Sequence, residues 1–181
     1  MPVWHHVLEE VLRDRRSALV GYAALFTLDR SEAEDLAHDA IVRTFAKPRS
    51  LTDVYSAEGY VRAVIRTIFI DSTRRSVSWR AKAHLLAETD HAPSPEHATA
   101  AVLDVRAALA GLAPRERAVA VLRFFDDFTV PEIAHELDLS TGAVKRYLSD
   151  ATAKLRTALG PDVLPDDATA VTTIRTGRSE P

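Results

Sequence analysis

The chain has 181 residues, of which 46% are hydrophobic, enough to build a packed core in one ordinary domain or two small ones. It contains no cysteine, which excludes disulfides, thiol catalysis and cysteine-containing metal sites and is consistent with a reducing compartment. Residues 1–16 are polar and charged, and no apolar run approaches the roughly 18 residues of a membrane span. We therefore expect a cytoplasmic protein that is not inserted in a membrane.

The net charge of −3 argues mildly against a nucleic-acid-binding protein, but its distribution matters more than its sum. Residues 1–80 hold 12 Lys and Arg residues against 11 Asp and Glu residues, and residues 106–160 hold 8 against 7. Residues 81–105 hold 1 against 4, and residues 161–181 hold 2 against 4. The acidity lies in two short segments, which leaves room for cationic surfaces elsewhere.

Helical periodicity dominates from the N-terminus, and strand patterns are almost absent. One or two helices are expected over residues 5–29, followed by a helix over residues 31–47. Ser31 and Glu34 are predicted to form a capping box at the start of that helix. Its apolar stripe comprises Ala33, Leu36, Ala37, Ala40, Ile41, Thr44 and Phe45.

A loop over residues 47–57 is predicted to precede another helix over residues 58–75. The buried side of this helix is expected at Val61, Val64, Ile65, Ile68 and Ser72. Residues 62–82 carry six basic side chains against the single acid Asp71, the largest charge concentration in the chain. Binding to a nucleic-acid backbone is one use of such a stretch. The alternative is an ion-pair network between Asp71 and its basic neighbours in the helix.

Prolines, small residues and negative charge interrupt the helical pattern between the two halves of the chain. The sequence therefore predicts two all-α domains, over residues 1–80 and 105–160, joined by an acidic linker over residues 81–104. Gly111 and Pro114 break the second domain into short helices. Residues 161–181 have little periodicity and are predicted to be a disordered tail.

Residues 129–148, "TVPEIAHELDLSTGAVKRYL", combine two closely spaced helices with signals that fix their ends. Thr129 with Glu132 forms a capping box, and Ser140 can cap the second helix. Such a compact pair is typical of a helix-turn-helix, whose second helix lies in a DNA major groove. Residues 141–156 carry four basic side chains and one acid. The alternative is a helical hairpin whose charges are merely solvated.

Three stretches together resemble the extracytoplasmic-function sigma factors of the sigma-70 family. They are "AEDLAHDAIVRTF", "YVRAVIRTIFIDSTRR" and "LAPRERAVAVLRFFDDFTVPEIAHELDLSTGAVKRYLSDATAKLR". Their order matches the family's domain 2, linker and domain 4, and the resemblance covers about residues 10–158. It implies a protein that directs core RNA polymerase to promoters, with partners that are the polymerase β′ clamp helices and β flap, promoter DNA and an anti-sigma factor.

The resemblance also implies roles for individual residues. Polymerase docking falls to Asp35, His38, Asp39 and Arg43. Contact with the melted −10 element falls to Tyr55, Tyr60, Arg62, Arg66, Arg74 and Arg75, with Tyr55 the favoured stacking residue. Recognition of the −35 duplex falls to Ser140, Thr141, Gly142, Lys145 and Arg146. Taken alone, the polar stripe around Asp35 is more typical of a solvated helix face than of a docking surface.

The sequence departs from the family pattern at a few positions. His38 stands where members usually carry Gln. Asp150 occupies a position that is often basic, where it would repel phosphate and could pair instead with Arg146 or Lys154. The acidic linker residues Glu88, Asp90 and Glu96 suit the basic active-site channel of the polymerase, where they could mimic nucleic acid.

Two other classes of function compete with this interpretation. An enzyme is disfavoured because the sequence has no phosphate-binding Gly-rich loop, zinc-protease motif or nucleophile elbow. The seven histidines form no metal-ligand pattern, so we expect no catalytic site, metal or cofactor. A stand-alone helix-turn-helix regulator would bind duplex DNA without core polymerase, whereas a sigma factor would bind the polymerase first.

Overall fold

The structure is a computed structural model that describes residues 3–46, 51–80 and 100–164. No strand occurs among them, which confirms the predicted all-α class. The chain divides into two compact units, Met1–Ala110 and Gly111–Pro181. The expected boundary at 104/105 falls inside a helix of the first unit, α5 (Ala100–Ala110). Residues 81–99 of the expected linker and 165–181 of the expected tail lie outside the described residues.

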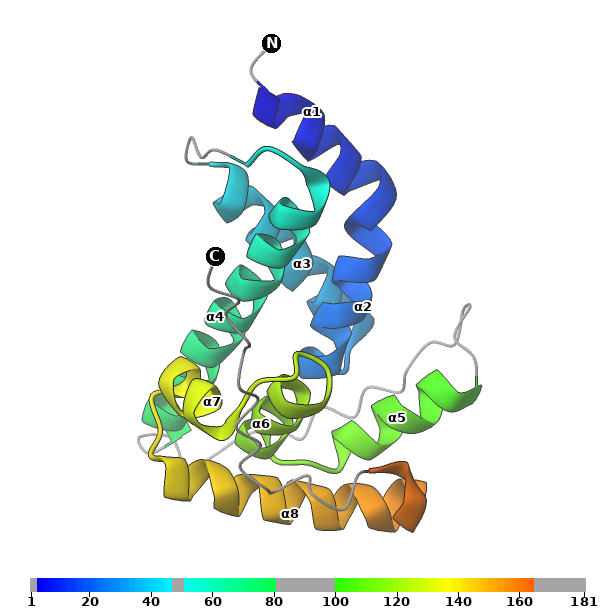
Figure 1. Cartoon of the computed structure of the whole chain (residues 1–181), viewed down its shortest axis with the longest axis vertical. Coiled ribbons are helices and arrows are strands. Elements are labelled where there is room, and N and C mark those ends of the chain that lie inside the picture. The colour runs from blue at the N-terminus through cyan, green and yellow to red at the C-terminus, as the bar shows by residue number, and fades with distance from the viewer. Residues whose placement is uncertain (1–2, 47–50, 81–99, 165–181) are drawn as a thin grey trace, which may run out of the picture. The chain divides into compact units, whose positions relative to one another are not determined.

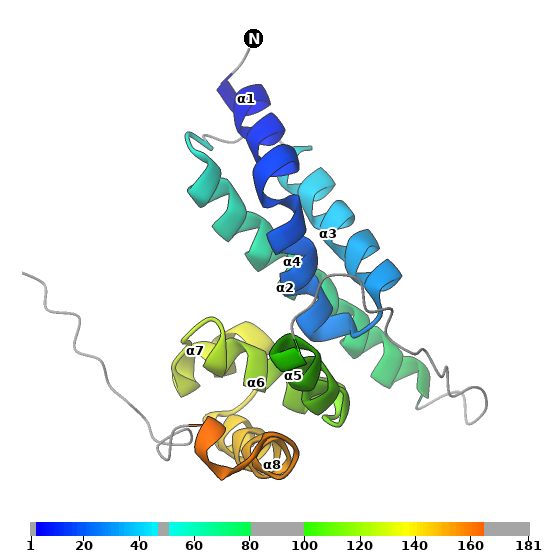
Figure 2. The same ribbon diagram turned by 90° about the vertical axis from the view of Figure 1, so that its right-hand side faces the viewer.

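The first unit is built on three helices that pack against one another, α2 (Arg16–Thr27), α3 (Arg30–Phe45) and α4 (Val54–Arg80) (Figures 1 and 2). The chain enters α2 through α1 (Val3–Glu10) and a single π-helical turn, η1 (Val11–Arg15). The ring of Phe26 sits in the core, 5.3 Å from the ring of Tyr22 and 5.1 Å from that of Phe69 between centroids. The contact between Phe26 and Phe69 joins α2 to α4.

The start of α3 differs from the prediction. The capping residue is Asp29, whose Oδ1 accepts a hydrogen bond of 2.9 Å from the Glu32 amide. Ser31 already lies in the first helical turn, so its predicted capping box with Glu34 is wrong, and Glu34 pairs with Arg30 at 3.0 Å instead. The predicted apolar stripe is confirmed, because six of its members are buried and Phe45 is half-buried.

The helix α4 begins four residues earlier than predicted because Asp53 caps it. The Asp53 carboxylate accepts from the amides of Tyr55 (3.0 Å) and Ser56 (2.9 Å) and from the Ser56 hydroxyl (2.7 Å). Those bonds, chiefly from Ser56, lower the pKa of Asp53. Tyr55 therefore lies in the first turn of a helix and not in a loop.

The buried side of α4 follows a four-residue spacing along the helix. Its buried residues are Ala57, Val61, Ile65, Phe69 and Ile70. Val64 and Ile68 are half-buried, whereas Ser72 is exposed, so the prediction was wrong at Ser72.

The second unit comprises α6 (Pro114–Phe124), α7 (Val130–Leu137), α8 (Thr141–Leu159) and a short 3-10 helix, η2 (Pro161–Val163). The long helix α8 packs against both α6 and α7. Large side chains that are fully buried form the core: Val119, Val121, Leu122, Val130, Ile133, Val144 and Leu148. The predicted break between α5 and α6 is confirmed, since α5 ends at Ala110 and α6 begins at Pro114.

Candidate nucleic-acid interface

The turn between α7 and α8 has the tightness that a helix-turn-helix requires. Asp138 ends α7 in the left-handed conformation, with φ of 53°, and its amide donates to the Ala134 and His135 carbonyls. The Leu139 amide then donates to the Ala134 carbonyl at 2.9 Å. Ser140 caps α8 by accepting from the Ala143 amide at 3.1 Å, and the Thr129–Glu132 capping box opens α7. Both predicted caps are confirmed.

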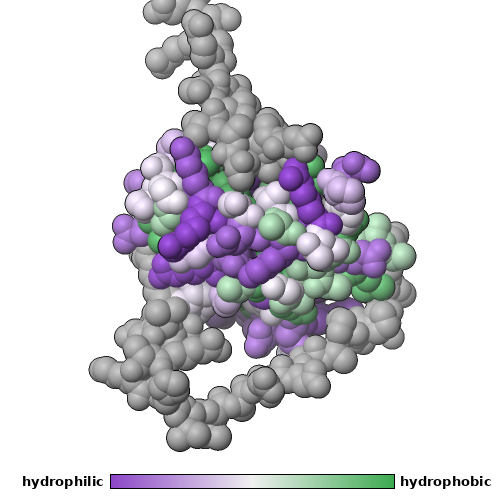
Figure 3. Space-filling view, turned by 90° about the horizontal axis from the view of Figure 1, so that it is seen from below, coloured by the Kyte–Doolittle hydropathy of each residue, from purple (hydrophilic) through white to green (hydrophobic). Residues whose placement is uncertain are grey.

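The five residues predicted to contact the −35 element come together on the first turns of α8, and all five are exposed. No ion pair among the described residues involves Lys145 or Arg146, although the Arg146 guanidinium lies 5.3 Å from the centroid of the Tyr147 ring. The view onto α8 shows a broad hydrophilic area (Figure 3). A cationic, solvent-facing helix start of this kind can bind phosphate oxygens and base edges.

The back of α8 is tied to α6 by a salt bridge that the sequence did not reveal. Lys154 Nζ donates to Glu116 Oε2 at 2.7 Å and to Oε1 at 2.9 Å. Asp150 therefore does not pair with Lys154, and it has no ion pair with Arg146 in the described part of the chain. Asp150 stays exposed on α8 as an unneutralised acid.

The residues predicted for the −10 element do not all share one surface. Tyr55, Arg62 and Arg66 fall on one stripe of α4, because positions three, four and seven apart lie on one helix face. Tyr60 is half-buried on another side of the helix. Helix α4 continues through Arg74 and Arg75, but their side chains lie outside the described residues.

The α4 stripe of Tyr55, Arg62 and Arg66 makes hydrogen bonds, ion pairs and cation–π contacts with residues of η1, α2 and α4 itself. Arg62 Nη2 donates to Glu58 Oε1 at 2.7 Å, and its guanidinium lies 5.2 Å from the centroid of the Tyr22 ring. Arg66 Nη1 donates to the Tyr22 hydroxyl at 3.3 Å. Arg15 Nε lies 3.5 Å from Glu58 Oε2.

Sequence reasoning missed Arg15, Tyr22 and Glu58 as members of this cluster. The Glu58–Arg62 spacing of four residues was a usable signal, since such pairs meet on a helix surface. Arg15 and Tyr22 reach α4 only through the packing of the bundle, which no local pattern encodes.

On α3, the four residues predicted to dock on the polymerase are all exposed. The structure adds Val42 to this face, because its position fits the stripe of Asp35 and Asp39 and it is 51% exposed. A half-exposed valine between charged side chains offers an apolar contact to a protein that binds this face. Sequence reasoning missed it, since it placed Val42 neither in the apolar stripe nor among the docking residues.

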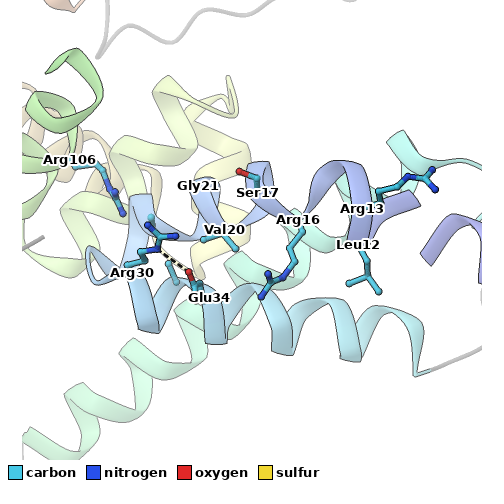
Figure 4. Close-up of a pocket in the computed structure, with 11 residues that line it drawn as sticks. Leu12, Arg13, Arg16, Ser17, Val20, Gly21, Arg30, Glu34 and Arg106 are labelled. Carbon is cyan, nitrogen blue, oxygen red and sulfur yellow. Dashed lines mark hydrogen bonds and ion pairs between the residues drawn. The ribbon is translucent and has the colours of Figure 1, made fainter. Parts of the chain in front are cut away.

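A hollow of about 520 Å³ on the first unit gathers cationic side chains from η1, α2, α3 and α5 (Figure 4). Its lining residues are Leu12, Arg13, Arg16, Ser17, Val20, Gly21, Ala24, Arg30, Ala33, Glu34 and Arg106. Arg30 is paired with Glu34 and Arg13 with Asp14, so part of this charge is already neutralised. None of the predicted site residues lines it.

Across the described ranges, no group of three or more His, Cys, Asp and Glu residues could hold a metal ion. The described helices also include none that is long and apolar enough to cross a membrane. The surfaces that stand out are the start of α8, the Tyr55 stripe of α4 and the Asp35 stripe of α3.

Comparison with known proteins finds relatives that all carry the names of sigma factors. The family model described as "Sigma-70, region 4" matches residues 108–157. The RNA polymerase sigma-E factor of Streptomyces coelicolor is 35% identical over 159 residues, which cover 83% of this chain and 85% of that protein. The ECF RNA polymerase sigma factor SigL of Mycobacterium tuberculosis is 30% identical over 161 residues, covering 84% and 89% respectively.

Among solved structures, the sigma factor RpoE of Bartonella quintana, crystallised in complex with the anti-sigma factor NepR, shares the fold with a TM-score of 0.54. The match covers 85% of this chain and 96% of that chain at 21% sequence identity. This likeness therefore concerns the fold alone.

Proposed function

We propose how this chain, which belongs to the extracytoplasmic-function group of sigma-70 family RNA polymerase sigma factors, divides promoter recognition between its two units. The second unit binds the −35 duplex through α8. The first unit docks on core polymerase through α3 and holds melted −10 DNA through α4. The chain brings no chemistry of its own, and the polymerase carries out the phosphoryl transfer.

The observation that carries this proposal is the exposed cationic start of α8 on a tightly fixed helix-turn-helix. Lys145 and Arg146 are exposed, while Val144 and Leu148 anchor the opposite side of the same turns in the core. A rigid α8 can therefore enter a major groove without rearrangement of the core. Phosphate contacts supply most of the affinity, and base edges supply the sequence choice.

The α4 stripe supports a role with single-stranded DNA. Tyr55 is 69% exposed, and the guanidinium groups of Arg62 and Arg66 follow it along the same face. Exposed aromatic rings beside guanidinium groups suit unpaired bases and their phosphates. The exposed α3 stripe, with Val42 among its charges, supports docking on the β′ clamp helices, and the second unit would meet the β flap.

An anti-sigma factor is proposed as a further partner, since the structural relative was crystallised with one. A stand-alone regulator would need only the second unit to bind DNA. It is disfavoured because the sigma-factor relatives match 83% or more of the chain, which takes in the first unit as well.

In vitro transcription with purified core polymerase and a promoter library tests the proposal. The wild-type chain should direct initiation at a defined start site. The pair Lys145→Ala and Arg146→Ala should abolish promoter binding but keep polymerase binding, whereas Asp35→Ala with Asp39→Ala should weaken polymerase binding. A wild-type chain that neither binds core polymerase nor selects a start site contradicts the proposal. Tight duplex binding without polymerase favours the regulator instead.

A further inference from the structure

We infer that Arg15 and Tyr55 form a subsite for one nucleotide of single-stranded DNA, and that Glu58 competes with the DNA phosphate for the surrounding guanidinium groups. This inference rests on the proposed binding of melted −10 DNA by the first unit. It adds two residues, Arg15 from η1 and Glu58 from α4, to which neither the family resemblance nor the comparisons assign a role.

Tyr55 provides the stacking surface. Its side chain is 69% exposed, more than the other large apolar side chains that stand out at the surface, which are Leu12, Val42, Val102 and Phe125 at 44–51%. The ring is held in place, because the Tyr55 amide is fixed by Asp53 and the Arg15 guanidinium lies 4.8 Å from the ring centroid. Arg15 lies over part of the ring, and the exposed remainder is left for a base, with the Arg15 cation in reach of that nucleotide's phosphate.

Gly59 opens the space next to this ring. It lies one turn after Tyr55 on the same face of α4, and a Cβ there would meet no atom within 4 Å. The fold therefore does not require glycine at this position, although glycine makes a helix interior less stable than alanine does. Bare backbone between Tyr55 and Arg62 lets a sugar or base approach the helix closely.

Glu58 sets how strongly the subsite attracts a phosphate. Its side chain is only 13% exposed and faces two guanidinium groups, Arg62 at 2.7 Å and Arg15 at 3.5 Å. The Arg15 Nε makes no hydrogen bond in the structure, so the Glu58–Arg15 pair is the weaker of the two. An incoming phosphate can therefore take Arg15 more easily than Arg62, and it does so in competition with Glu58.

The test measures binding of the holoenzyme, formed from the full chain and core polymerase, to a fluorescent single-stranded oligonucleotide. The oligonucleotide carries the −10 sequence of a promoter that the holoenzyme uses. Arg15→Gln should weaken binding several-fold and reduce the slope of log K against log salt by about 0.7, the value for one phosphate contact on a single strand. Arg13→Gln is the matched control, because Arg13 is an exposed arginine of the same turn, paired with Asp14.

Three further pairs of variants separate the roles of Glu58, Tyr55 and Gly59. Glu58→Gln should tighten binding several-fold, whereas Glu34→Gln, which neutralises the exposed partner of Arg30, should not. Tyr55→Ala should weaken binding about five- to hundredfold, as expected for loss of one stacked base, and Tyr55→Phe should not. Gly59→Ala should weaken binding while raising Tm, and Gly21→Ala, at another exposed helical glycine with open space, should raise Tm alone.

The inference is overturned if Arg15→Gln and Arg13→Gln give the same affinity and the same salt slope. It is also overturned if Glu58→Gln fails to tighten binding, an arm that keeps the test valid should Arg15→Gln not fold. A wild-type holoenzyme that does not bind the oligonucleotide contradicts the −10 role itself. The two failures are therefore distinguishable.

Discussion

Lys154 and Glu116 form a bidentate salt bridge that fastens α8 to the first turn of α6, with Nζ 2.7 and 2.9 Å from the two carboxylate oxygens. The Glu116 side chain is 10% exposed and also accepts from the Ala113 amide at 2.9 Å. Burial raises the pKa of Glu116, but the hydrogen bonds from Lys154 and Ala113 and the charge of Lys154 outweigh burial and hold the pKa below its usual value. The Glu116 carboxylate thus caps the start of α6 and also holds α8, the helix proposed to bind DNA, against α6.

Glu116→Gln should lower the free energy of unfolding by about 1–2 kcal/mol at neutral pH, because Lys154 is half-exposed and water replaces part of the lost contact. A lowered folded pKa gives stability that is present above the unfolded pKa of about 4.3 and is lost as pH falls through the folded pKa. The stability gap between wild type and variant should therefore shrink on acidification. Thermal unfolding from pH 7 to pH 3 checks this.

Glu34→Gln is the control for that series. Its partner Arg30 is 56% exposed in the side chain, so the change in stability should stay below about 0.5 kcal/mol at every pH. A gap for Glu116→Gln that is constant with pH would contradict the assigned titration.

The cap of α3 gives a second prediction. Asp29→Ala should lower the free energy of unfolding by about 1 kcal/mol, because it leaves the Glu32 amide without its acceptor. Ser31→Ala, two residues on, should change it by only a few tenths of a kcal/mol, since alanine is favoured inside a helix. Denaturant unfolding of the two variants decides between the caps, and a larger loss for Ser31→Ala would contradict the structure.

The fold was largely predictable because the local signals in this chain agree with the tertiary structure. Apolar spacing predicted the stripe of α3, and the Thr129 and Ser140 caps predicted where α7 and α8 begin. The wrong predictions concern the starts of α3 and α4, where several polar residues compete as caps. Asp29 and Asp53 were both passed over in favour of later starting points, because a cap is decided by backbone conformation and not by residue type alone.

The candidate surfaces were predicted less completely. A residue's exposure on a known helix follows from periodicity, so Lys145 and Asp39 were placed correctly on solvent faces. Periodicity along one helix does not predict which residue of another helix pairs with a charged side chain. Lys154 was one of two partners considered for Asp150 but pairs with Glu116 of α6, and Arg15 reaches Glu58 only because η1 packs on α4.

Val42 gives a third prediction, for the polymerase-docking face of α3. Val42→Asp should weaken binding to core polymerase at least tenfold, because it places an acid where we propose an apolar contact. The free energy of unfolding should change by less than about 0.5 kcal/mol, since the side chain is half-exposed. Competition with a labelled sigma factor for core polymerase measures the affinity.

Val102→Asp is the matched control for Val42→Asp. Val102 is 49% exposed on α5, outside the proposed docking face, so it undergoes the same chemical change at the same exposure. Equal loss of polymerase affinity in both variants would show a general effect of charge and would remove Val42 from the interface.

Gly142 supplies the last prediction. Adding a single Cβ atom there should affect DNA binding and stability in opposite directions. It lies in the first turn of α8, and a Cβ there would meet only Ser140 Oγ, at 4.0 Å, an ordinary van der Waals distance. Gly142→Ala should therefore keep or raise the free energy of unfolding, by up to about 1 kcal/mol. Binding of the holoenzyme to a −35 duplex should nevertheless fall several-fold, because the added methyl keeps the start of α8 from approaching the DNA backbone. Ala143→Gly, at the next position of the same turn, should show the opposite signature of lower stability with duplex affinity retained. If Gly142→Ala binds the duplex as tightly as wild type, the start of α8 does not make the close contact that we assign to it.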